Sequence, residues 1–181
     1  MRCFAALFAL CLVAPAGADV TGCACDVAQP QTLEARECSL CRAAEAQPAE
    51  PAIFFLKDTN PRKSNRTLAL PRFHGKAQHP LAAMTPEQRT MLWTAAIEKA
   101  KSLWGSEWGL AVNGDMARTQ CHAHIHIGKL LPGNETVFFV VVDGPAQIPV
   151  PEDGTGLWVH PVGSKLHVHT AEQITETVLL R

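Results

Sequence analysis

Residues 122–127 read HAHIHI, so three histidines alternate with small or apolar residues. In an extended strand, successive side chains point to opposite faces of the sheet. The pattern therefore predicts a strand over about Cys121 to Ile127, with Ile125 and Ile127 facing the core. The opposite face carries the three imidazoles: His122, His124 and His126. A chain with this strand must build a sheet that has one buried face and one face open to a ligand.

Three imidazoles on one open face indicate two chemistries. Neutral imidazole is a common ligand of zinc and copper, so the strand is a candidate metal site. Alternatively, one ring nitrogen attacks a phosphorus atom while the neighbouring rings bind the phosphate and move protons. A strand face without function is the third interpretation. The three histidines alone do not decide between a metal site and a catalytic nucleophile.

Composition narrows the class of protein. The chain has 181 residues, of which 47% are hydrophobic, which is enough for one domain with a real core. Its formal net charge is −1, so it has no basic excess. A nucleic-acid binder that relies on bulk positive charge is therefore excluded, and we expect no nucleic-acid partner.

The N-terminus has the form of an export signal. Arg2 precedes a short apolar run over Cys3 to Val13, and Ala16-Gly17-Ala18 matches a small-residue cleavage site. We predict a signal peptide over 1–18 and a periplasmic or secreted protein. Two alternatives remain: an uncleaved anchor, and a lipoprotein attached at Cys23.

Residues 19–51 form a polar, cysteine-containing N-terminal arm in this interpretation. Its four cysteines have the spacing C-x-C…C-x-x-C: Cys23, Cys25, Cys38 and Cys41. Export favours two disulfides among them over a zinc knuckle, although the sequence does not give the connectivity. A structural zinc at Cys38 and Cys41 is the minor alternative. Cys121 is then left over, and we expect a small buried residue there.

The rest of the chain, 52–181, reads as one α+β domain with an antiparallel sheet, one long helix and a short C-terminal helix packed on it. Thr85, Pro86 and Gln88 form a capping box that starts the long helix, and Gly105 is its expected stop. Thr170 and Gln173 suggest a second cap, which would start a helix over 171–180. The expected strands cover 53–56, 67–70, 110–113, 121–127, 137–142, 157–162 and 165–169, the 137–142 strand being buried.

The order of motifs around the histidines resembles a known family. Residues 54–74, FFLKDTNPRKSNRTLALPRFH, have the form strand, D-x-x-P, strand, P-x-x-H, and the capped helix, LAVNG and Gln120 follow. Over about 53–129 this order resembles the histidine-triad (HIT) superfamily of nucleotide hydrolases and transferases. The compact R-T-Q-x-H-x-H-I-H-I form is most similar to the CDP-diacylglycerol diphosphatase branch. The resemblance implies a HIT-like fold for 52–181.

The resemblance implies a role for each residue of the triad. His124 would be the nucleophile that forms a nucleotidyl-histidine intermediate, and a backbone carbonyl or another nearby group would set its tautomer. His122 and His126 would bind the phosphate oxygens, and Gln120 would donate to the phosphate or to the leaving group. The products would be a nucleoside monophosphate (CMP) and phosphatidate. No metal or other cofactor is required by this chemistry.

The resemblance also suggests a substrate-binding set: His74, Asp58 and Asn113, with Asp58 toward the ribose. Turn chemistry is the alternative for Asp58 and Asn113. Lys57 and Arg72 belong to a basic stretch that would attract a diphosphate or an anionic membrane surface, unless it is simply solvated. Whether the chain forms a homodimer is left open.

Two further functions remain as alternatives. A generic family member would hydrolyse a dinucleoside polyphosphate or a nucleoside phosphoramidate. An exported metal-binding protein would use the triad together with His167, His169 and the cysteines. We predict that the later histidines lie on the surface or at the rim of the site rather than acting as ligands: His160, His167 and His169.

Overall fold

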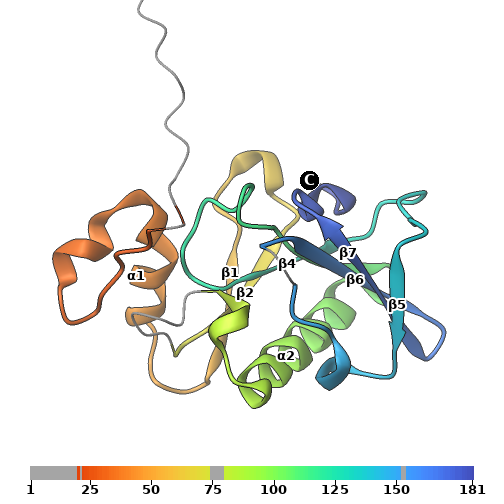
Figure 1. The fold of residues 1–181 in the computed structure, drawn as a ribbon, viewed down its shortest axis with the longest axis horizontal. Coiled ribbons are helices and arrows are strands. Elements are labelled where there is room, and N and C mark those ends of the chain that lie inside the picture. Colours follow the sequence, from red (N-terminus) through yellow and green to blue (C-terminus); the bar gives the residue numbers. More distant parts are fainter. Residues whose placement is uncertain (1–19, 21, 74–79, 152–153) are drawn as a thin grey trace, which may run out of the picture.

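A computed structural model describes residue 20 and residues 22–73, 80–151 and 154–181 of the chain (Figure 1). The predicted signal peptide and the predicted substrate-binding residue His74 lie outside the described residues. The described part confirms the α+β class and the antiparallel sheet. Seven strands form one sheet in the order β1-β2-β4-β3-β6-β7-β5. No helix among the described residues has the length and apolar character needed to cross a membrane.

The strands are β1 (Ile53–Lys57), β2 (Thr67–Pro71), β3 (Trp108–Val112), β4 (Ile125–Lys129), β5 (Phe139–Val142), β6 (Gly156–Val162) and β7 (Lys165–Glu172). The α-helices are α1 (Ser39–Glu45) and α2 (Pro86–Trp104). Short 3-10 turns are η1 (Pro30–Glu34), η2 (Arg36–Cys38), η3 (Pro61–Lys63), η4 (Leu81–Ala83), η5 (Pro145–Gln147) and η6 (Thr175–Val178).

Helix α2 begins and ends where its local sequence predicts. The Thr85 side chain accepts a hydrogen bond from the backbone N–H of Gln88, and the Gln88 side chain accepts one from the N–H of Thr85. This reciprocal pair satisfies two donors that the first turn of a helix leaves without partners. At the other end Gly105 adopts a φ of 59°, a conformation that residues with a Cβ rarely take.

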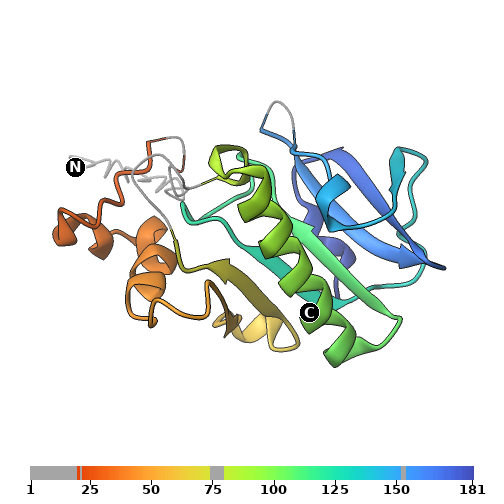
Figure 2. The same cartoon turned by 90° about the horizontal axis from the view of Figure 1, so that it is seen from below.

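One face of the sheet packs on α2, which crosses in front of the strands in Figure 2. Leu92, Trp93 and Ala96 of the helix belong to the same buried cluster as Ile125 and Ile127 of β4. The two isoleucines therefore face the core, as the alternating pattern predicts. The side chains that alternate with them lie on the sheet face opposite α2, and this face carries the histidines.

The N-terminal arm lies beside β1 and β2 at one end of the sheet (Figures 1 and 2). Two disulfides hold it: Cys23–Cys121 and Cys25–Cys38. Two bridges are present, as predicted, but only Cys25–Cys38 joins two of the four arm cysteines. The expectation that Cys121 is left over is wrong. Cys41 is instead the buried cysteine that keeps its thiol. Spacing along the chain could not reveal this, because the partner of Cys23 is 98 residues away.

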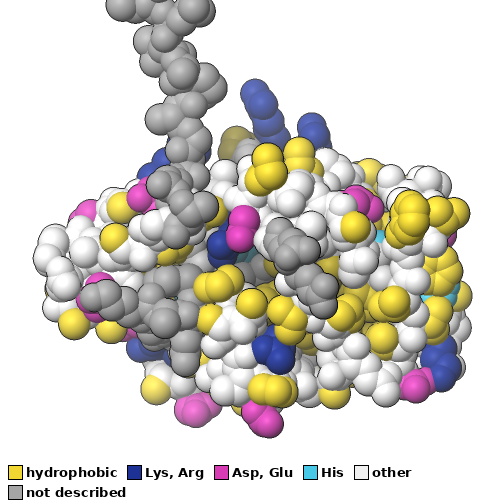
Figure 3. All heavy atoms as spheres, in the orientation of Figure 1, with side chains coloured by type: hydrophobic (Ala, Val, Ile, Leu, Met, Phe, Trp, Pro, Cys, Tyr) yellow, Lys and Arg dark blue, Asp and Glu magenta, His cyan; other side chains and the backbone are white. Residues whose placement is uncertain are grey.

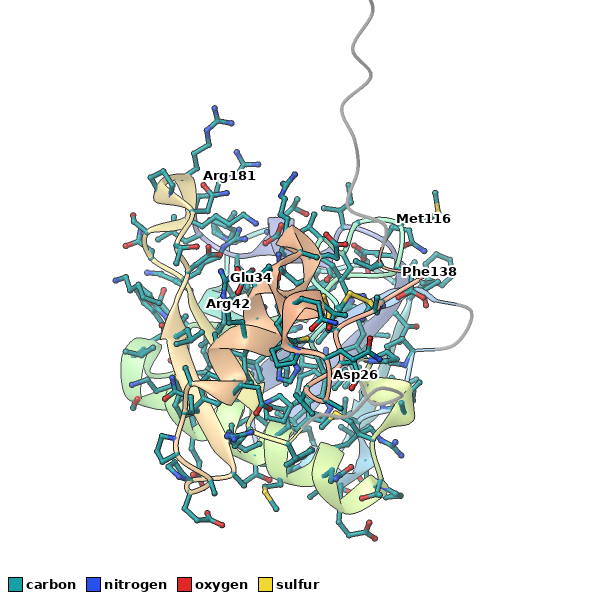
Figure 4. All side chains as sticks on the ribbon, turned by 90° about the vertical axis from the view of Figure 1, so that its left-hand side faces the viewer. Asp26, Glu34, Arg42, Met116, Phe138 and Arg181 are labelled. Atoms are coloured by element: carbon teal, nitrogen blue, oxygen red, sulfur yellow. A yellow bond between two sulfur atoms is a disulfide. The ribbon has the colours of Figure 1, made fainter. Side chains whose placement is uncertain are left out.

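The outer surface of the arm is solvated. Figure 4 looks onto this end of the molecule and shows Glu34 and Arg42 near one another. Their side chains form an ion pair of 2.7 Å in which both partners are largely exposed. An exposed pair of this kind contributes little to stability. The arm is therefore held mainly by its disulfides and by its contacts with the sheet.

The C-terminal segment differs from the prediction. The expected helix over 171–180 is absent from the described residues, and strand β7 instead continues to Glu172, which pairs with Gly156 of β6. A single 3-10 turn, η6, follows. The Gln173 side chain bonds the backbone of Met116 and Gly154 rather than capping a helix. Pairing with β6 outweighs the local capping pattern.

Strand β5 is not buried, in contrast to its apolar sequence. Among the described strands it pairs with β7 alone, and it forms one edge of the sheet. Apolar side chains around it gather at one end of the molecule in Figure 3. We call the exposed residues the apolar strip: Val137, Phe138, Phe139, Val140 and Val141. Val137 and Phe138 are 85% and 74% exposed.

Candidate active site

The triad lies at the start of β4, in the middle of the sheet. His122 and His124 come just before the strand, and His126 lies within it, paired with Leu68 of β2 and Ala111 of β3. All three histidines are buried. The ring of His126 stands edge-on to that of His124, with 4.9 Å between the ring centroids.

His124 has a defined tautomer. Its Nδ1 lies 2.8 Å from the backbone oxygen of His122, so Nδ1 carries the proton and donates. Neutral imidazole has one N–H and one lone pair, so the lone pair is on Nε2. This geometry matches the expectation that a backbone carbonyl binds the ring nitrogen that does not attack and so sets the tautomer of His124. Burial is the main cause that lowers the pKa of His124, which keeps the ring neutral near pH 7.

His122 plays a different part from the other two rings. It is fully buried, and its Nε2 lies 2.8 Å from the carbonyl oxygen of Pro71 at the end of β2. It is not among the residues that line the cavities around His124. The ring thus fastens the segment before β4 to β2, while the His122 carbonyl orients His124. Its predicted contact with phosphate remains a prediction.

His126 faces a carboxylate that the sequence did not identify. Its Nδ1 lies 3.5 Å from Oε2 of Glu176 in η6. Glu176 also bonds Lys63 Nζ at 2.7 Å and Arg66 Nη1 at 2.6 Å. Burial, followed by the nearby charges, lowers the pKa of His126 well below its ordinary value. No local motif marks Glu176, because its partners Lys63 and Arg66 are 113 and 110 residues away in the chain.

Asn113 fixes Glu176 in place. Its Oδ1 accepts hydrogen bonds from the backbone N–H groups of Thr175 and Glu176, at 3.1 Å each, and from the Thr175 hydroxyl at 3.2 Å. One side-chain oxygen therefore satisfies three donors at the start of η6. Asn113 acts through these bonds, as a support for the carboxylate beside His126.

A polar cavity of about 380 Å³ opens over the triad. It brings together five of the predicted site residues: Asp58, Asn113, Gln120, His124 and His126. The basic side chains in its lining are Arg36, Lys63 and Arg118. An anionic ligand such as a phosphate group would find both hydrogen-bond donors and positive charge here.

Gln120 joins this cavity to the N-terminal arm. Its Oε1 accepts from the Ser39 hydroxyl at 2.8 Å and from the Leu40 N–H at 3.2 Å, and its Nε2 donates to the Arg36 carbonyl at 3.0 Å. The amide therefore holds the start of α1 against the triad segment. Its predicted donation to the substrate would require one of these bonds to open.

Arg118 is a site residue that the motif comparison did not single out. It lines the polar cavity together with His124, and its charge contributes to lowering the pKa of His124. Nη1 donates to the Cys121 carbonyl and Nη2 to Asp115, while the buried Nε makes no hydrogen bond within the described part of the chain. A guanidinium held in this way is suited to bind a phosphate oxygen.

Two more cavities lie near the polar cavity, and His124 lines the nearer of them. A narrow cavity of about 150 Å³ shares Asn113, Arg118 and His124 with the polar cavity. It shares Pro151 and Thr155 with an apolar cavity of about 450 Å³, whose lining reaches Val140 in the apolar strip. The three cavities therefore lie next to one another in a row, with the polar cavity at one end and the apolar cavity, lined by Val140, at the other.

The remaining predicted residues lie elsewhere. Lys57 is exposed at the end of β1. Asp58, by contrast, lines the polar cavity, and its Oδ1 also accepts a hydrogen bond of 2.9 Å from the N–H of Asn60, which is turn chemistry. Arg72 bonds the Gln47 carbonyl and Glu45, so it ties α1 to β2. Neither Lys57 nor Arg72 lines the polar cavity. Cys38, one of the two cysteines of the minor zinc alternative, is bonded to Cys25 in the structure.

A scan against models of known protein families finds no match for the chain, and a search of curated proteins finds none either. The fold and the site geometry therefore define an α+β protein with a buried histidine nucleophile candidate beside a polar cavity.

Proposed function

We propose that the chain is a HIT-like hydrolase that cleaves the diphosphate bond of CDP-diacylglycerol or a similar lipid-linked nucleotide through a nucleotidyl-histidine intermediate. One observation carries the proposal. The His124 Nδ1 donates to the His122 carbonyl, so the Nε2 lone pair of a neutral ring is the free nucleophile at the junction of two cavities.

The reaction has two displacements. Nε2 of His124 attacks the phosphorus atom that carries the nucleoside; a P–N bond forms, and the bridging P–O bond breaks. Phosphatidate leaves with the electron pair. A phosphate monoester has a second pKa of about 6, so it leaves near neutral pH without a strong general acid. Water then adds to the same phosphorus atom, the P–N bond breaks, and CMP leaves.

The charged groups around the ring have roles in this scheme. Arg118 lies in both cavities beside His124, where it would bind a non-bridging oxygen and stabilise the charge of the transition state. His126 would bind the second oxygen. Glu176, anchored by Lys63 and Arg66, places its carboxylate 3.5 Å from Nδ1 of His126. No step needs a metal ion.

The row of cavities favours a lipid-linked substrate over a soluble one. The polar cavity suits the cytidine and the phosphates, whereas the apolar cavity opens toward Val140 and the apolar strip. An acyl chain could follow this path and bury apolar surface that a dinucleoside polyphosphate lacks. The two disulfides are also compatible with an oxidising compartment, where soluble polyphosphates are scarce.

The test is a substrate panel on the purified chain: CDP-diacylglycerol in detergent micelles, diadenosine tetraphosphate and adenosine phosphoramidate. We expect CMP release from the first to be the fastest, and EDTA to leave its rate unchanged. His124→Ala should lower the rate at least about a thousandfold while keeping the wild-type Tm. Label from cytidine should remain on the quenched wild-type protein in acid-labile form.

Each other result has a defined meaning. Faster hydrolysis of the adenosine substrates would support the generic nucleotide hydrolase instead. Full activity of His124→Ala would contradict the mechanism. A rate that EDTA abolishes, and that one divalent ion restores, would point to metal chemistry at the triad.

A further inference from the structure

A second histidine cluster lies on the same sheet face as the triad. His160 belongs to β6, and His167 and His169 belong to β7. Their strand neighbours Val159 and Val168 pack in the core against α2, so the three histidines point to the opposite face. His169 is fully buried and His160 nearly so, which contradicts the expectation of surface residues. None of them lines the polar cavity.

A carboxylate completes the cluster. Glu135, from the segment between β4 and β5, reaches the three rings so that four side-chain donors lie within 4.8 Å of one another. His160 Nε2 lies 3.0 Å from Glu135 Oε2 and 3.2 Å from His169 Nε2. Glu135 Oε1 lies 2.9 Å from His167 Nδ1 and 3.6 Å from His169 Nε2.

These separations are those of ligands around a single ion. Zn²⁺ binds imidazole nitrogen and carboxylate oxygen at 2.0–2.2 Å, in tetrahedral geometry. Two donors at that distance are about 3.3 Å apart across a tetrahedral angle. Four of the contacts among these side chains run from 2.9 to 3.6 Å, and all four donors lie within 4.8 Å of one another. Hydrogen bonding explains the arrangement less well, because a single proton on His160 Nε2 cannot serve both of its neighbours.

Neighbouring side chains fix the orientation of the histidine rings in this cluster, as is usual for metal ligands. Thr136 Oγ1 lies 2.8 Å from His169 Nδ1, so this nitrogen can donate to the hydroxyl while Nε2 presents its lone pair to an ion. Trp158 stacks on His169 with 3.6 Å between centroids, and Phe139 stacks on His167 at 4.5 Å.

We propose that His160, His167, His169 and Glu135 form a binding site for one divalent transition-metal ion of the Zn²⁺ class, separate from the triad. The Glu135 side chain is 49% exposed, which gives the ion a route from solvent. The bound ion fastens the segment that carries Glu135 to β6 and β7, beside the apolar strip. The site does not depend on the proposed hydrolase activity.

The test uses the purified full chain without a polyhistidine tag, stripped with EDTA and dialysed against Zn²⁺. We expect one Zn²⁺ per chain and a higher Tm with the ion bound. Co²⁺ should give the intense visible absorption of a tetrahedral site. Glu135→Gln and His167→Asn change the two more exposed ligands, so they should fold. Together they should weaken Zn²⁺ binding at least about a hundredfold.

The control is His124→Ala, which removes a triad ring and should leave Zn²⁺ binding unchanged. Three results would overturn the proposal: no stoichiometric binding by the wild-type chain, unchanged affinity in the Glu135/His167 variant, or loss of binding in His124→Ala. The last result would assign the ion to the triad instead.

Discussion

The Nδ1 of His124 donates to the backbone oxygen of His122, two residues earlier, at 2.8 Å. A contact between neighbours in the chain thus decides which nitrogen of a buried ring keeps its lone pair. The His122 ring is itself bonded to the Pro71 carbonyl of β2, which fastens this residue to the sheet. The local sequence places the His122 carbonyl next to His124, and the contact with β2 fixes the position of His122.

The pH profile of hydrolysis should report this ring. Attack requires neutral His124, and burial lowers its pKa below 6.5. We therefore expect kcat/KM, which reflects the free enzyme, to stay level as pH falls from 8 to 6.5 and to decline only below that. The measurement is initial CMP release across a constant-ionic-strength pH series. An acid midpoint at or above 6.5 would contradict the assignment of His124 as the buried nucleophile.

The stability of the fold should depend on pH with a definite sign. The pKa values of His124 and His126 are both lower in the folded chain, mainly through burial. Below pH 6.5 the unfolded chain binds protons at these positions and the folded chain does not, so stability falls as pH drops from 6.5 through the folded values. Urea midpoints should show this decline, and a His124→Gln/His126→Gln variant should show a shallower one.

Asn113→Ala should destabilise the chain by about 1–3 kcal/mol, because three donors at the start of η6 lose their acceptor. Asn113→Asp keeps an acceptor oxygen and is the matched control, with a smaller loss. Urea unfolding measures both. If the two variants lose equal stability, the three hydrogen bonds are not what fixes Glu176 and η6.

Loss of the Cys23–Cys121 bridge should harm the site more than loss of Cys25–Cys38. The first closes a sequence separation of 98 residues and ends one residue before His122, whereas the second spans 13. We expect the Cys23→Ser/Cys121→Ser variant to lose about 2–5 kcal/mol and most of its activity. Thermal unfolding and initial rates of both paired variants test this. Equal losses would show that the bridge does not position the triad.

The apolar strip should matter only for lipid-linked substrates. Val137→Ser/Phe138→Ser removes its two most exposed members, so hydrolysis of CDP-diacylglycerol in vesicles should fall several-fold. Hydrolysis of a short-chain, soluble analogue should not change. Met91→Ser, an exposed apolar residue on α2, is the control. A fall with both substrates would indicate damage to the fold rather than a lost lipid contact.

Much of the fold follows from short stretches of sequence. The α2 boundaries rest on the capping box at Thr85 and on Gly105, both of which act within one helical turn. The strand at the triad follows from the alternation of His126 with Ile125 and Ile127, whose side chains must lie on opposite faces. The helix boundaries were predicted correctly, because they depend on neighbours in the chain. The strand was predicted only in part, since the expected range 121–127 overlaps β4 at 125–127 and leaves His122 and His124 before the strand.

The tertiary structure decided everything that depends on distant partners. Cys121 pairs with Cys23, and Glu176 meets Arg66 and His126 across the sheet. Local signals were outweighed at the C-terminus, where pairing between β6 and β7 replaced the predicted helix. No local motif predicts that Glu135 meets the second histidine cluster. The histidines lie on β6 and β7, and the register of the sheet decides which side chains come together there.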